Sequence, residues 1–232
     1  MKRSRLAAAA VFAVGLAVTS GACSSNQPTS PSPATSSARY RVTFESVWSG
    51  STHPQDFPGS PHFSGLIGGT HAASVTFWRA GQLATEGIRL MAERGAKVDL
   101  QTEVEDAIGR GLAQYVLSGR SIDLSPGAVT LEFDISSTHP LVTLVSMVAP
   151  SPDWFVGVNG LALFESGAWK DSVTIDLFPY DAGTDSGMTF SSPDQATTPR
   201  QPIARITGFP FLNTPGGGTV SSLGTFRIDR IN

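Results

Sequence analysis

The sequence contains a single cysteine, Cys23, among its 232 residues. It therefore excludes both an intrachain disulfide framework and a zinc site built from several thiolates. Charged side chains are also scarce, at 15% of the residues, whereas soluble domains average ~25%. The net charge is −3, and it becomes −6 if Lys2, Arg3 and Arg5 leave with a removable leader, because 13 basic and 19 acidic residues remain. A surface of this sign repels phosphate backbones, so no nucleic-acid partner is expected.

Long apolar runs are absent beyond the N-terminus, where residues 6–18 form a run of thirteen after a basic start. A helix of that length spans about 20 Å, which is short of the ~30 Å hydrocarbon core of a bilayer. The pattern therefore predicts a signal peptide over residues 1–22, and it predicts export.

Cys23 directly follows the small residues of this leader, an arrangement that resembles the lipobox of bacterial lipoproteins. There the thiol is lipidated and becomes the new N-terminus, although Ser20 stands where that family prefers Leu. The alternative is an ordinary signal peptide cleaved after Ala22, which leaves a free thiol and a secreted protein. In the lipoprotein case, residues 23–38 are a lipidated cysteine followed by a Ser/Pro-rich linker. The linker is too polar to fold by itself. The protein is expected in the bacterial cell envelope, with the lipid as its sole membrane contact, or free outside the cell.

Helix-breaking residues are abundant, with 24 Gly and 16 Pro, which argues against a helix bundle. Residues 39–232 are expected to form one domain with a sizeable core. Alternating apolar and polar residues, separated by turn-rich segments, predict an antiparallel β-sandwich or barrel. The strands are expected at residues 40–44, 73–78, 129–135, 141–148, 154–158, 172–178 and 224–231.

Two stretches instead indicate helices that lie over this β core. Thr102 and Glu105 fit a capping box, and Gly119 would close the helix that follows. Its apolar stripe recurs every four residues, at Val104, Ile108, Leu112 and Val116. A shorter helix is expected over residues 86–94, ending at Gly95.

The densest polar cluster is the loop over residues 179–187, in which Asp181 and Asp185 alternate with glycines. Calcium takes six to eight oxygen ligands, and a glycine-containing acidic loop suits it. The loop is not an EF-hand, because Ser186 stands where that motif has Gly and Ser192 where it has Glu. The alternative is an Asx-turn in which each aspartate caps its own backbone. Asp153, on a proline-stiffened loop, is either a convergent ligand or part of a surface turn.

Enzyme signatures are weak. The serine in residues 183–187 stands fourth, so the loop is not a nucleophile elbow. Asp185-Ser186-Gly187 matches the aspartic-protease triplet, but that chemistry needs two aspartates, so the single copy would serve only across a symmetric dimer.

Four tryptophans form either a sugar-stacking surface or core anchors: Trp48, Trp78, Trp154 and Trp169. Three histidines, spaced nine residues apart, are either metal ligands or hydrogen-bonded loop residues: His53, His62 and His71.

Taken in order, these motifs closely resemble the spondin N-terminal domain family. The matching stretches are residues 40–44, 48–49, 52–58, 62–71, 84–87, 150–157 and 179–187. The resemblance implies a C2-like antiparallel β-sandwich with one or two peripheral helices. It also implies a calcium ion held by Asp153, Asp181 and Asp185. Animal members are secreted adhesion proteins with further modules and bracing cysteines, which this chain lacks.

Together these observations predict an exported, lipid-anchored, calcium-binding module that attaches to a protein or glycan at a cell surface or in a matrix. No enzyme activity is expected, because no nucleophile–base pair and no open catalytic metal site can be named. The alternative is a secreted hydrolase, either a dimeric aspartic enzyme built on Asp185 or a carbohydrate-active protein that uses the tryptophans.

Overall fold

The computed structural model describes residues 36–232, and the first strand, β1, begins at Ser37. The folded part thus starts two residues before the expected boundary at Arg39. The predicted signal peptide, Cys23 and most of the expected linker lie outside the described residues. Within residues 36–232, no helix has both the length and the apolar composition needed to cross a membrane.

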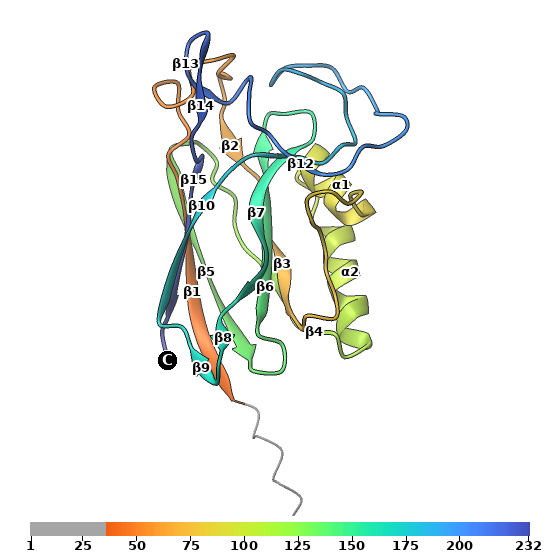
Figure 1. Cartoon of the computed structure of the whole chain (residues 1–232), viewed down its shortest axis with the longest axis vertical. Coiled ribbons are helices and arrows are strands. Elements are labelled where there is room, and N and C mark those ends of the chain that lie inside the picture. Colours follow the sequence, from red (N-terminus) through yellow and green to blue (C-terminus); the bar gives the residue numbers. More distant parts are fainter. Residues whose placement is uncertain (1–35) are drawn as a thin grey trace, which may run out of the picture. The chain divides into compact units, whose positions relative to one another are not determined.

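One layer of the molecule is a four-stranded antiparallel sheet in the order β10–β15–β1–β5 (Figure 1). Its strands are β1 (Ser37–Ser46), β5 (Gly127–Ser136), β10 (Ser172–Leu177) and β15 (Gly224–Arg230). The first strand therefore pairs with the last, and Phe44 lies opposite Phe226. Polar side chains alternate with these aromatics and form cross-strand contacts on the outer face, such as the 2.7 Å ion pair between Arg41 and Glu132.

The second layer is a seven-stranded antiparallel sheet whose strands differ in length. Their order is β12–β11–β7–β6–β3–β4, with β2 paired to β6. Its strands are β2 (His62–Phe63), β3 (Ile67–His71), β4 (Ala113–Ser118), β6 (Leu141–Ala149), β7 (Trp154–Ala162), β11 (Tyr180–Asp181) and β12 (Ala204–Arg205). Two small hairpins complete the fold, namely β8 (Phe164–Glu165) with β9 (Ala168–Trp169) and β13 (Leu212–Thr214) with β14 (Gly217–Val220).

Two apolar cores hold the layers together, and β6 contributes to both. Val142 and Leu144 face the core between the sheets, where Trp48, Phe63 and Phe226 are fully buried. Val145 and Met147 face the opposite core, beneath the helices. The predicted antiparallel β-sandwich with peripheral helices is confirmed.

Helices α1 (Glu86–Arg94) and α2 (Val98–Gly109) cover the face of the second sheet that points away from the first (Figure 1). The predicted short helix is confirmed as α1, which ends at Gly95 in the left-handed conformation. Its N-cap is Thr85, whose Oγ1 accepts the Ile88 N–H at 3.2 Å.

The helices pack closely because β3 presents bare backbone to them. A Cβ atom on Gly69 would lie 2.6 Å from Cγ1 of Val104, and one on Gly68 would overlap the carbonyl of Thr143 in β6. Glycine at both positions therefore allows β3 to fit between α2 and β6.

The predicted helix over residues 102–119 is wrong at both ends. Helix α2 begins at Val98, so Thr102 lies inside it and donates its hydroxyl to the Val98 carbonyl rather than capping. The helix ends at Gly109, because Gly111 adopts a left-handed φ of 71°. Val116 belongs to β4, so the four-residue spacing crossed from a helix into a strand.

The predicted strand over residues 73–78 is also wrong, since this segment is an irregular connection without strand pairing. Phe77 and Trp78 are nevertheless buried, and both pack in the core beneath the helices. Two aromatic anchors on a loop produced an apolar pattern that was interpreted as a strand.

Candidate functional site: three aspartates beside an arginine-lined pocket

Asp153 and Asp181 are brought together by the pairing of β11 with β7. Asp181 lies opposite Trp154, the residue after Asp153, and the Ala182 N–H donates to the Asp153 carbonyl at 3.1 Å. The chain then turns so that the Thr184 and Asp185 N–H groups donate to Oδ2 of Asp153, at 2.7 and 3.0 Å. The three predicted ligands therefore come from two loops that meet at one end of the second sheet.

The acidic loop is braced by a later segment of the chain. Gly183 has a left-handed φ of 75°, and a side chain there would overlap the carbonyl of Gln201, whose own N–H donates to Gly183 at 2.9 Å. The Thr197 N–H donates to the Thr184 carbonyl at 2.9 Å. Later residues of the chain, Thr197 and Gln201, thus fix the loop. No spacing in the sequence indicates these contacts.

The alternative prediction of Asx-turns also describes part of this loop. Asp181 Oδ1 accepts the Gly183 N–H at 2.7 Å, and Asp185 Oδ1 accepts the Gly187 N–H at 2.8 Å. Asp185 Oδ2 accepts the Gln195 N–H at 2.7 Å, so both oxygens of this carboxylate brace backbone. This engagement gives no support to a protease dyad built on Asp185.

Asp153 lies in an environment that disfavours its charged form. The residue is fully buried, and its Oδ1 has no hydrogen-bond partner. Burial raises the pKa of Asp153 to about 6, and the nearby charge of Asp181 adds to the rise. Burial likewise raises the pKa of Asp181, with a smaller contribution from the charge of Asp185. The charged forms of Asp153 and Asp181 are therefore destabilised by their surroundings.

The donor atoms of these aspartates suit calcium, because they are all oxygens and one of them is buried without a partner. In residues 36–232, however, no three His, Cys, Asp or Glu side chains are already arranged to hold a metal ion. Calcium binding here would use Asp153 Oδ1, the free lone pairs of oxygens that already accept N–H groups, and further oxygens from backbone or water.

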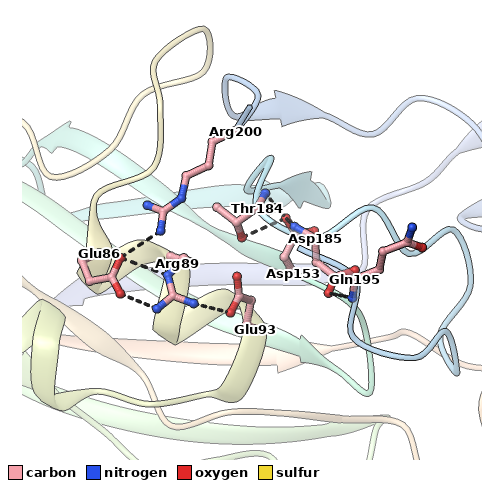
Figure 2. A network of polar contacts seen from close by, with 8 residues as sticks. All are labelled: Glu86, Arg89, Glu93, Asp153, Thr184, Asp185, Gln195 and Arg200. Atoms are coloured by element: carbon pink, nitrogen blue, oxygen red, sulfur yellow. Dashed lines mark hydrogen bonds and ion pairs between the residues drawn. The ribbon is translucent and has the colours of Figure 1, made fainter. Parts of the chain in front are cut away.

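A charged pocket of about 410 Å³ adjoins this cluster, between α1 and residues 184–200. Figure 2 shows Arg89 held between Glu86 and Glu93 of α1, with Arg200 reaching Glu86 from the later loop. The hydrogen bond from Arg89 lowers the pKa of Glu86 to about 2. The sequence analysis missed this pocket, because a helix carrying Glu and Arg three or four residues apart is typical of an ordinary solvated face.

The three predicted histidines do not converge. Each ring is bonded to its own surroundings: His53 to Thr52 and Ser221, His62 to Ser60, and His71 to Ala72 and Thr143. The interpretation as hydrogen-bonded histidines is confirmed, but His62 lies in β2 and His71 in β3 rather than in loops.

The tryptophans are core residues rather than a sugar-stacking surface. Trp48, Trp78 and Trp154 are buried, and the partly buried Trp169 packs against Phe164 with ring centroids 4.8 Å apart.

Comparison with known proteins identifies relatives of this chain. The Spondin_N family model matches residues 38–213. Spondin-2 of Rattus norvegicus is 40% identical over 175 residues, which cover 73% of this chain and 53% of the rat protein. Spondin-2 of Homo sapiens is 39% identical over the same shares, and spondin-1 of Rattus norvegicus is 35% identical over 84% of this chain and 25% of its own length. The chain thus spans about half of spondin-2 and a quarter of spondin-1.

Proposed function

Because this chain belongs to the spondin N-terminal domain family, we propose that it is an exported, calcium-binding β-sandwich that binds a ligand at a cell surface or in an extracellular matrix. The ligand is a protein or a glycan, and the module acts by binding rather than by catalysis. A lipid on Cys23 attaches the module to a membrane.

The observation that carries the calcium assignment is the state of Asp153. A buried carboxylate oxygen without a hydrogen-bond partner costs free energy, and the nearby charge of Asp181 increases that cost. A divalent cation among Asp153, Asp181 and Asp185 offsets all three charges at once. It also ties the loop before β7 to the loop after β11, which stabilises this end of the sandwich.

The test is a calorimetric calcium titration of the mature protein, combined with thermal unfolding in calcium and in chelator. We expect calcium to raise the melting temperature, since a ligand at a hundred times its dissociation constant adds about 2.7 kcal/mol of stability. Asp181→Asn should weaken calcium binding at least tenfold, because it removes one charge but keeps an Oδ1 that can accept the Gly183 N–H.

The matched control is Asp176→Asn, which removes an exposed carboxylate on β10, a strand of the other sheet. It should leave the calcium affinity unchanged. If no binding heat is seen and the melting curves with calcium and with chelator coincide, the calcium assignment is wrong.

A further inference from the structure

The pocket between α1 and residues 184–200 has charged walls and no aromatic lining. Arg89 and Arg94 come from α1, and Arg200 comes from the loop that braces the acidic cluster. The remaining walls include the hydroxyl-bearing Thr197 and Thr198. A pocket without an aromatic face lacks the flat apolar surface on which sugar rings stack, so its chemistry favours a charged, hydrogen-bonding ligand over a glycan.

The three guanidinium groups are not equivalent. Arg89 is committed to the protein, because it pairs with Glu86 and, at 2.6 Å, with Glu93. Arg200 makes one 3.2 Å contact with Glu86 and is 42% exposed. Arg94 is exposed and forms no ion pair or side-chain hydrogen bond with any residue in the described part of the chain. Arg94 and Arg200 therefore have N–H donors available on the same pocket.

The acidic residues of the pocket oppose an anion less than their number implies. The charge of Glu93 is offset by Arg89, and Asp185 already accepts backbone N–H groups at both oxygens. Asp194 is exposed, so water screens its charge. The strongest remaining feature is two arginine side chains with free N–H groups on one pocket, and the planar fork of a guanidinium pairs well with a carboxylate.

We propose that this pocket binds a carboxylate group of an acidic peptide segment of a partner protein, with Arg94 and Arg200 as the direct contacts. The inference rests on the proposed function in that it names the partner class of the same module. Asp185 links the two sites, because it borders the pocket and belongs to the aspartate cluster. A cation bound at that cluster makes the pocket wall more positive, so calcium should strengthen peptide binding.

The experiment measures the fluorescence anisotropy of a labelled peptide of alternating glutamate and glycine, titrated with the mature protein in calcium and in chelator. A glutamine–glycine peptide of the same length and an oligogalacturonate serve as the neutral and glycan arms. We expect the glutamate peptide to bind, more tightly in calcium, and the glutamine peptide to bind at least tenfold more weakly.

Arg94→Gln and Arg200→Gln should each weaken peptide binding, and the double variant should abolish it. Arg120→Gln is the matched control, since it removes an exposed arginine outside this pocket and should change nothing. Asp194→Asn should tighten binding less than twofold, because water already screens the repulsion between this carboxylate and the ligand.

Calcium titration of the same variants separates the two proposals. Arg94→Gln should retain wild-type calcium affinity while it loses the peptide. Peptide binding without any calcium binding would contradict the calcium site and leave the pocket assignment standing. Equal binding of the two peptides, unchanged binding by the double variant, or binding of the oligogalacturonate alone would each overturn the assignment of an acidic peptide.

Discussion

At the scale of single residues, the imidazole of His71 is held by hydrogen bonds at both nitrogens inside the core beneath the helices. Nδ1 donates to the Ala72 carbonyl at 2.9 Å, and Nε2 lies 2.8 Å from Oγ1 of Thr143. Because a carbonyl accepts only, Nδ1 carries the proton and Nε2 accepts from the threonine hydroxyl, which itself accepts the Gly160 N–H. This network satisfies both nitrogens of the neutral ring.

We expect His71 to make the fold less stable as the pH falls. Burial lowers its folded-state pKa, backbone oxygens of Ala72 and Val75 oppose this shift, and the charge of His139 adds to the lowering. The unfolded chain therefore takes up a proton near pH 6.5 that the folded chain resists. The contribution of His71 is complete above that pH and is lost below it, at up to about 1.4 kcal/mol per pH unit.

The measurement is urea unfolding between pH 7.5 and 5.5 for wild type and for His71→Gln. The difference between their slopes isolates the imidazole, because the carboxylates and the similarly buried His53 are common to both. His139→Gln, at a partly exposed position, serves as control and should keep most of the wild-type slope. Parallel pH profiles for wild type and His71→Gln would contradict the prediction.

The candidate site was predictable only where local or family motifs marked it. The acidic loop indicated Asp181 and Asp185, Asp153 was an open alternative, and the resemblance implied that all three hold one ion; the structure has them on two adjoining loops. Arg94 and Arg200 were not predicted, because they are far apart in the chain and neither stands in an unusual local pattern. Their meeting depends on the bracing of residues 184–201, which is a tertiary effect.

At the scale of elements, the strands with one buried face were predictable. Strands whose sequence does not alternate between apolar and polar residues were not. β1, β5 and β15 alternate apolar and polar residues because each has one face in the core and one in water. β3 escaped prediction, since its second and third residues are Gly68 and Gly69. Glycines have no side chains that could show an alternating pattern. Close packing of β3 against α2 and β6 requires glycine at both positions, because a Cβ atom would clash.

Two threonines distinguish a true helix cap from an apparent one. Thr85 Oγ1 accepts the Ile88 N–H at the start of α1, and it donates to Glu103 of α2 at 2.8 Å. Thr85→Ala should therefore lower the free energy of unfolding by about 1 kcal/mol, and somewhat more if the contact with Glu103 contributes.

Thr102→Ala should instead be neutral or slightly stabilising, because Thr102 lies in the interior of α2, where alanine has the higher helix propensity. Both variants are compared with wild type by chemical denaturation at pH 7. A larger loss for Thr102→Ala than for Thr85→Ala would contradict the observed helix bounds.

At the scale of the whole molecule, the proposed lipid anchor and the folded domain depend on different parts of the chain. The proposed lipid attachment is at Cys23, whereas residues 36–232 contain no cysteine. Cys23→Ala should therefore move the protein from the membrane fraction to the soluble fraction, or stall its processing, without changing its unfolding midpoint. Cell fractionation and the mass of the mature protein test this. An unchanged distribution and mass would instead support ordinary secretion.

The pairing of β1 with β15 also determines when the first sheet can finish folding. Residues that face each other across this pair, such as Tyr40 and Arg230, come from opposite ends of the domain's sequence. During synthesis or translocation, β1 emerges early, yet one of its edges has no partner until the final residues follow. Pairings between distant parts of a chain form slowly. The sheet therefore closes only after the whole domain has left the ribosome or the export channel.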